Sequence, residues 1–187
     1  CRRLGDWQRV TGDENLFVSV NISSRQLIRQ DLIGDVKTVI ERYRISPNSL
    51  KLELTESLVM DNPERSAQLL TRLKALGVGL SLDDFGTGYS SLAYLMGFPF
   101  DTLKIDQSFL KNNSQPQRPI ILHSIVTMAH DLGLKVVAEG IESDADVMQL
   151  RQLGCEFAQS FKFSPPLGSD QVRKILDDRA VGLKRAS

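Results

Sequence analysis

Short apolar runs recur along the chain, and each ends in a polar or acidic residue before a helix-like stretch begins. The alternation predicts βαβ units and a parallel sheet, because parallel strands need a helical crossover between them. The expected strand ends lie near residues 21, 53, 83, 104, 139 and 159. The six runs are "LFVSVNIS" (16–23), "SLKLELTES" (49–57), "VGLSLDDF" (78–85), "DTLKIDQS" (101–108), "LKVVAEGIE" (134–142) and "GCEFAQSF" (154–161).

The stretches between the runs carry helix signals. Asn62 can act as an N-cap with Pro63 at the first helical position, and leucines then recur on one face. Gly133 and Gly154 follow two further helical patterns as C-terminal glycines. We therefore predict helices over 62–76, 118–132 and 143–153, and the opening "CRRLGDWQRV" also has the pattern of an amphipathic helix.

Six such units without a glycine-rich dinucleotide fingerprint favour a (β/α)8 TIM-like barrel over a doubly wound sheet. No low-complexity linker divides the sequence, so we expect a single domain over 1–187. The most loop-like insertion is "KNNSQPQRP" at 111–119. The predicted fold class is thus α/β, with one parallel barrel.

Composition excludes several classes of protein. Lysine plus arginine (23) equals aspartate plus glutamate (23), so no net field attracts a nucleic-acid polymer or an anionic membrane. No apolar run approaches the ~20 residues that span a bilayer. Two cysteines without metal-ligand spacing are typical of a reducing, cytoplasmic setting. The first residue is Cys1, so we expect a fragment of a longer chain that other segments could anchor to a membrane.

Chemistry-bearing side chains gather where the predicted strands end, which in a barrel is one common face. Two of them, Asp83 and Asp84, are adjacent acids that repel each other unless a cation lies between them. Carboxylate and amide oxygens suit Mg²⁺ or Mn²⁺ rather than zinc. Adjacent acids could serve two ions ~3.5–4 Å apart, as in phosphate-ester cleavage. The strand-end residues are Asn21, Glu53, Asp83, Asp84, Lys104, Glu139 and Gln159.

Each residue taken alone also has a structural interpretation. Asn21 could cap the next helix, and Glu53 and Glu56 could form surface ion pairs or a capping box. Lys104 could be a solvated strand-end lysine or a partner of Asp106.

Glu139 and Glu142 could begin the following helix, where the dipole favours acids.

The "DFG" tripeptide could suggest a protein kinase, but the chain has neither a catalytic "HRD" loop nor a glycine-rich nucleotide loop. Convergence of acids, an amide and a lysine from separate strands favours a site over solvation.

Six linked motifs, in order and spacing, resemble the EAL-type cyclic di-GMP phosphodiesterase domain. The resemblance implies a (β/α) barrel in which two Mg²⁺ or Mn²⁺ ions activate a water molecule. That water attacks one phosphodiester of cyclic di-GMP and gives linear pGpG, in bacterial second-messenger signalling. The motifs are "VNISSRQL", "LELTES", "LDDFGTGYSSLAYL", "LKIDQSFL", "VVAEGIES" and "GCEFAQSF" followed by "FSPPL".

The resemblance also implies roles for single residues. Asn21, Glu53 and Asp83 resemble ligands of one ion. Asp83, Asp84 and Glu139 resemble the set around the second, with Glu139 and Lys104 as catalytic residues. Lys104 resembles the lysine that orients and deprotonates the attacking water, and its pKa should fall beside two cations.

Three further residues resemble supporting parts of such a site. Glu56 resembles the glutamate that holds the loop "DFGTGYSS" (84–91), which couples metal binding to dimer contacts. Glu142 and Gln159 resemble residues that line the substrate pocket. Cyclic di-GMP, a second copy of the chain and regulatory domains elsewhere in the parent protein are the implied partners.

The sequence departs from the family pattern in three places. The Glu-Ala-Leu motif of the first barrel strand does not occur, so we expect an incomplete barrel representing about the C-terminal three-quarters of the domain. Ser160 stands where glycine is usual and adds a side chain beside the pocket. Pro165 stands where a basic residue is common and removes a phosphate-side charge. A binding module that senses cyclic di-GMP without cleaving it, or an unrelated magnesium-dependent barrel enzyme, remains an alternative.

Overall fold

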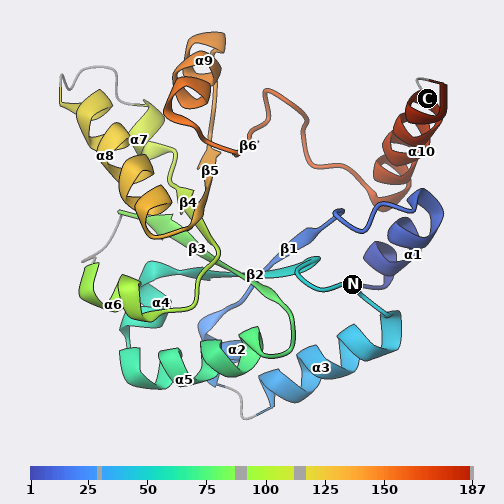
Figure 1. Cartoon of the computed structure of the whole chain (residues 1–187), viewed down its shortest axis with the longest axis horizontal. Helices are drawn as coiled ribbons and strands as arrows, with labels where there is room; N and C mark the ends of the chain where they lie inside the picture. Colours follow the sequence, from blue (N-terminus) through green and yellow to red (C-terminus); the bar gives the residue numbers. More distant parts are fainter. Residues whose placement is uncertain (29–30, 87–91, 112–116, 186–187) are drawn as a thin grey trace.

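The computed structural model describes residues 1–187 except 29–30, 87–91, 112–116 and 186–187. Its strands form one six-stranded parallel sheet in chain order, and each predicted apolar run contains one of them. Figure 1 shows this sheet curling between the helices rather than lying flat. The strands are β1 (Val18–Asn21), β2 (Leu50–Thr55), β3 (Gly79–Phe85), β4 (Thr102–Ile105), β5 (Lys135–Glu139) and β6 (Phe157–Gln159).

Helices connect successive strands, as the crossover geometry of a parallel sheet requires. The predicted helix signals are confirmed: the Asn62 side chain accepts a hydrogen bond from the Arg65 N–H, and Gly154 ends its helix with φ +86°. The helices are α1 (Arg2–Thr11), α2 (Ser24–Ile28), α3 (Leu32–Tyr43), α4 (Glu56–Met60), α5 (Pro63–Lys74), α6 (Leu92–Gly97), α7 (Ser108–Lys111), α8 (Arg118–Asp131), α9 (Asp144–Leu153) and α10 (Ser169–Arg185).

The two faces of the sheet differ in character because successive strand residues point to opposite sides. The outer face is aliphatic and packs against the helices, with Leu52, Leu80 and Leu103 at most 2% exposed. The inner face carries polar residues in every strand, among them Glu53 and Lys104. An apolar face under helices and a polar concave face are the division that a barrel active site needs.

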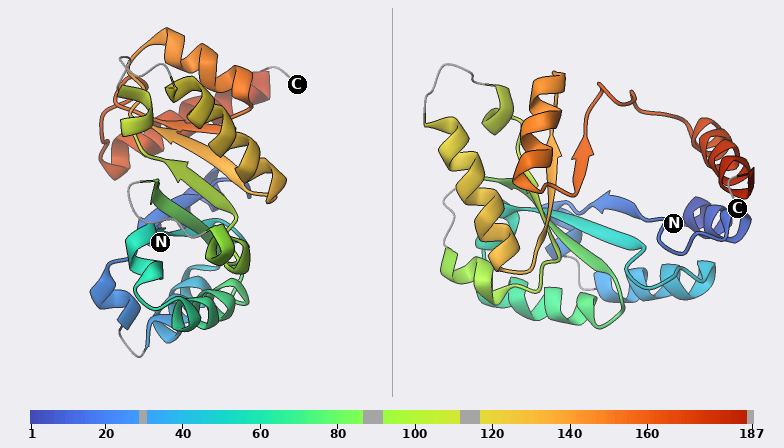
Figure 2. Two further views of the ribbon diagram at one scale, coloured as in Figure 1. Left: turned by 90° about the vertical axis from the view of Figure 1, so that its left-hand side faces the viewer. Right: turned by 45° about the horizontal axis from the view of Figure 1, so that its top comes forward.

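The sheet bends far enough for aromatic side chains next to the start of its first and last strands to touch. The rings of Phe17, just before β1, and Phe157, at the start of β6, lie edge to face with centroids 5.7 Å apart. Lys51 from β2 places its ammonium 3.9 Å from the Phe17 centroid, a cation–π contact inside the curve. The prediction of an incomplete (β/α)8 barrel is thereby confirmed: six parallel strands form a half-barrel with helices on its outer side (Figures 1 and 2).

The two ends of the chain lie together beside the open side of the half-barrel. After β6 the chain runs through an extended segment to α10, which packs against α1 (Figure 2). Arg3 and Asp170 form an exposed ion pair 3.9 Å long between these helices. Within the part of the chain that the structure describes, no helix is long and apolar enough to cross a membrane.

The buried leucines of the outer face should dominate the free energy of unfolding. Leu80→Ala removes a fully buried side chain from β3, and we expect it to cost about 2–5 kcal/mol through lost burial and a residual cavity. Met148→Ala on α9 is the matched control, since that side chain is 63% exposed. Urea unfolding followed by circular dichroism measures both, and equal losses would contradict the assigned core.

Candidate active site

Three carboxylates from three strands surround one lysine at the C-terminal edge of the sheet. The Nζ atom of Lys104, on β4, lies 2.9 Å from Glu53, 3.0 Å from Asp83 and 2.8 Å from Glu139. The Lys104 residue is only 4% exposed, so the interpretation as a solvated strand-end lysine is excluded. Parallel register brings these groups together, because each occupies an inward position near the end of its strand.

The pKa values at this centre follow from burial and from neighbouring charges. Burial alone would lower the pKa of Lys104, but hydrogen bonds to Glu139, Glu53 and Asp83 outweigh it and raise that pKa well above its ordinary value. Burial raises the pKa of Glu139 despite the nearby ammonium. The carboxylates thus stabilise the charged form of Lys104, whereas burial leaves Glu139 with a higher pKa than a free glutamate.

Asp84 occupies a distortion of the sheet. The ladder between β3 and β4 shifts register between Leu82 and Phe85, and Asp84 adopts a left-handed backbone with φ +54°. Its N–H donates to the Asp83 carboxylate at 3.0 Å. Burial and then Asp83 raise the pKa of Asp84. A β-bulge allows the side chains of Asp83 and Asp84 to lie on the same side of the sheet, whereas in a regular strand two consecutive side chains point to opposite faces.

Glu56 is buried at the start of α4 and contacts the loop that follows β3. Its Oε2 atom accepts a hydrogen bond of 3.1 Å from the Gly86 N–H, and the residue is only 2% exposed. Gly86 has φ +90°, and a Cβ there would lie 2.5 Å from the Phe109 ring. The rest of the loop predicted to be held by Glu56, residues 87–91, lies outside the described residues. The interpretation of Glu53 and Glu56 as surface ion pairs is excluded by their burial.

Asn21 ends β1 and is the cross-strand neighbour of Glu53. Its side chain is exposed, and the start of α2 is braced by the contacts of Ser23 with Gln26 rather than by an Asn21 cap. Asn21 is therefore available beside the carboxylates, at the edge of the cluster.

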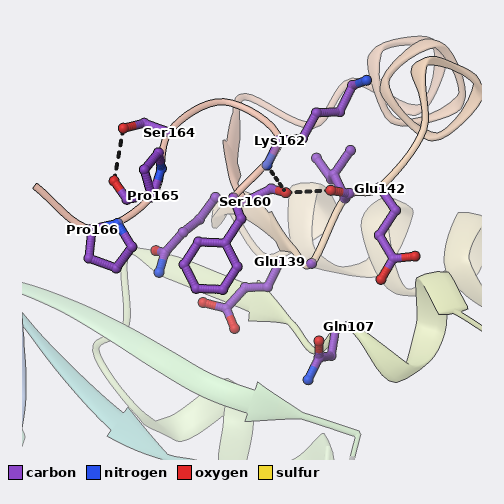
Figure 3. A pocket seen from close by; sticks show the side chains of 12 residues that line it. Gln107, Glu139, Glu142, Ser160, Lys162, Ser164, Pro165 and Pro166 are labelled. Carbon is purple, nitrogen blue, oxygen red and sulfur yellow. Dashed lines mark hydrogen bonds between the residues drawn. The ribbon is translucent and has the colours of Figure 1, made fainter.

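A cavity of about 920 Å³ opens beside Glu139, between the loops that follow β5 and β6. Glu142 and Gln159 lie on its wall, where the sequence predicted a substrate pocket. Figure 3 shows Glu139 on the side of this cavity that faces the sheet, with Gln107 below it and the proline-containing segment opposite. Cavities of this size bind nucleotide-sized ligands.

Seven residues of the pocket wall were missed by sequence reasoning: Gln107, Gly140, Ile141, Phe161, Lys162, Ser164 and Pro166. Phe161 could have been identified from the sequence, because an aromatic residue just beyond the end of a strand points away from the core. Its side chain is 78% exposed. Lys162 brings a positive charge to the wall and pairs with Asp144 at 3.0 Å. Pro165 also lines the cavity, as expected of a position that faces substrate.

Ser160 joins the two loops that form the pocket. Its hydroxyl donates to the Ile141 carbonyl and accepts from the Lys162 N–H at 3.0 Å (Figure 3). The Gly140 N–H donates to the Gln159 carbonyl at 3.0 Å, so the side chain of Ser160 extends the β5–β6 ladder by one link. A glycine at 160 could not make this contact.

The donor chemistry of the cluster fits a hard divalent cation. The carboxylates of Glu53, Asp83 and Glu139 surround the single Lys104 ammonium, and Asp84 adds a fourth acid directly after Asp83, so acids outnumber the lysine at this edge of the sheet. Among the described residues, no group of three His, Cys, Asp or Glu side chains shares one metal position. The reason is geometric: the Lys104 ammonium occupies the point at which three of the carboxylates meet.

Removal of the Lys104 ammonium should destabilise the fold, because the carboxylates around it would then repel one another. We expect Lys104→Met to lower the free energy of unfolding at pH 7, without divalent metal, by about 3–5 kcal/mol, because it leaves buried carboxylates uncompensated. The loss should shrink as pH falls, since a raised folded-state pKa such as that of Glu139 makes protonation favour the folded form. Urea unfolding at pH 4.5, 5.5 and 7 measures this, and a pH-independent loss would contradict the assigned cluster.

Comparison with known proteins finds relatives of similar sequence. The chain is 45% identical over 177 residues to cyclic di-GMP phosphodiesterase NbdA of Pseudomonas aeruginosa, a match that covers 94% of this chain and 22% of the relative. It is 40% identical over 177 residues to signaling protein YkoW of Bacillus subtilis, with the same two coverages. The chain thus spans less than a quarter of the length of these relatives.

Solved structures have the same fold. The structure described as PaMucR phosphodiesterase in complex with c-di-GMP superposes with a TM-score of 0.87 at 38% identity, over 92% of this chain and 70% of that one. The EAL domain of Mycobacterium smegmatis DcpA superposes with a TM-score of 0.87 at 34% identity, and the match covers 95% of this chain and 80% of that chain. The family model of the EAL domain matches residues 1–166. This chain belongs to the EAL domain family.

Proposed function

We propose that this domain hydrolyses one phosphodiester bond of cyclic di-GMP to linear pGpG with the help of two Mg²⁺ or Mn²⁺ ions. The observation that carries the proposal is the convergence of Glu53, Asp83 and Glu139 on Lys104 beside a nucleotide-sized cavity. Excess carboxylate charge favours divalent cations, and a phosphodiester substrate brings oxygen ligands of its own. When bound, the ions would supply Lewis acidity and a more acidic water.

The residues divide this work by position. Asn21, Glu53 and Asp83 would hold one ion, and Asp83, Asp84 and Glu139 the other. Cations that neutralise the carboxylates would also remove the cause of the raised Lys104 pKa, so the lysine could then give up its proton more easily. Lys104 would in that state orient the attacking water and accept its proton.

The supporting residues act on the loops and on the substrate. Glu56 would fix the Gly86 end of the loop after β3 through its hydrogen bond to the backbone. Glu142 and Gln159 offer acceptors and an amide to the edges of a guanine base. Phe161 offers an exposed aromatic face for stacking, and Lys162 a cation for a phosphate oxygen.

Relatives support the substrate. NbdA is named a cyclic di-GMP phosphodiesterase, and the MucR phosphodiesterase structure is a c-di-GMP complex. Because the chain covers only 22% of such relatives, regulatory domains in the parent protein and a second copy of this domain are further proposed partners. We also propose that the domain works in the cytoplasm, where a cyclic dinucleotide messenger would reach it.

Turnover of cyclic di-GMP tests the proposal. With Mg²⁺ or Mn²⁺ present, we expect linear pGpG to accumulate, and Lys104→Ala to reduce the rate by at least about 100-fold because the water loses its proton acceptor. Chromatography of the product measures both rates. Lys37→Ala on α3 is the matched control and should keep full activity, because Lys37 forms an exposed ion pair with Glu41.

Two other results would separate the alternatives. Saturable binding of cyclic di-GMP without any pGpG, in this chain and in the parent protein, would make the domain a receptor. Failure of both chains to bind the dinucleotide would contradict the proposed substrate.

A further inference from the structure

A second cavity lies at the opposite end of the sheet from the carboxylate cluster. Its volume is about 310 Å³, and it lies under the N-terminal ends of β2 to β5. Three of its charged side chains are lysines and one is an aspartate. The lining residues are Asn48, Lys51, Lys74, Gly79, Phe100, Asp101, Thr102, Gly133 and Lys135.

The single carboxylate of this cavity, that of Asp101, already forms an ion pair and a backbone hydrogen bond. Both oxygens of Asp101 lie 2.6 Å from the Lys74 ammonium, and one of them also accepts the Leu80 N–H at 2.8 Å. Lys51 and Lys135 form no ion pair with any carboxylate in the described ranges. Neither of these two ammonium groups is therefore matched by an ion pair, although the Lys51 ammonium lies 3.9 Å from the centroid of the Phe17 ring.

These two charges are held near each other by packing. The Lys51 stem crosses the backbone at Gly79, where a Cβ would come within 2.9 Å of the lysine Cγ. The ammonium groups of Lys51 and Lys135 lie 5.3 and 5.9 Å from the centroid of the same Phe157 ring.

A buried hydroxyl on the cavity wall adds an independent observation. Thr102 is 2% exposed, and its Oγ1 atom has no hydrogen-bond partner among the residues that the structure describes. An unsatisfied buried hydroxyl costs free energy, which a ligand oxygen would recover. The neighbouring Asn48 side chain adds an amide donor at the rim.

We propose that this cavity is a binding site for a doubly charged tetrahedral oxyanion, either inorganic phosphate or a phosphomonoester. Two ammonium groups that form no ion pair match a charge of −2, and lysine binds phosphate as a point charge. The Thr102 hydroxyl and the Asn48 amide supply neutral donors from other directions. The site lies at the N-terminal end of the strands, so it is separate from the proposed hydrolytic centre.

Calorimetric titration with inorganic phosphate, in EDTA and against chloride at equal ionic strength, tests the site without divalent metal or dinucleotide. We expect saturable binding that weakens at least about tenfold in Lys51→Met and in Lys135→Met, because each removes a charged donor. Thr102→Val should weaken it several-fold. Lys37→Met is the control on α3 and should bind as the unchanged chain does.

Lys135 is exposed, so its variants should fold, and Lys135→Arg should retain binding. Ribose 5-phosphate and ribose distinguish the two sources of the oxyanion: tighter binding of the sugar phosphate than of phosphate selects a phosphomonoester, and the reverse selects the free ion. Absence of saturable binding, or unchanged affinity in Lys135→Met, would overturn the proposal.

Discussion

The arrangement of the C-terminal edge of the sheet depends on one buried ammonium held by three carboxylates. Glu53, Asp83 and Glu139 come from different strands, and like charges this close would separate without a cation. Lys104 therefore has a structural role in the absence of metal, since it fixes the positions from which the same oxygens could receive divalent ions. Asp84 adds a further carboxylate at the bulge, next to Asp83.

The half-barrel supplies this cluster by separating its two faces. Leucines on the outer face pack under helices and fix the register of β2, β3 and β4. The inner face is left free for polar groups, with the acids at one end and lysines at the other. Charges of opposite sign thus lie at opposite ends of one concave surface, although the chain has no net charge.

Much of the fold and the cluster could be predicted from the sequence because both follow short-range rules. Apolar runs ending in polar residues gave the six strands, and Asn62 and Gly154 marked helix ends through their own backbone preferences. The convergence of strand-end residues follows from parallel topology alone. The metal roles of Asn21, Glu53 and Asp83 remain predictions, as does their catalytic use.

Other features depend on contacts that no local pattern encodes. The central position of Lys104 requires the register of four strands at once, and the bulge that turns Asp84 depends on the pairing of β3 with β4. Ser160 could be recognised as a departure, but its bond to the Ile141 carbonyl depends on where two distant loops meet. The pairing of Phe17 with Phe157 arises only when the sheet curls.

The central claim is that the carboxylates gathered by Lys104 form a divalent-cation site. Electron paramagnetic resonance with Mn²⁺ tests it most directly, because bound and free ions give distinct signals and can be counted. The account predicts saturable Mn²⁺ binding that is weakened at least about tenfold by Asp83→Asn and is unchanged by Asp101→Asn at the other end of the sheet. Equal Mn²⁺ binding by the unchanged chain and Asp83→Asn would contradict the account.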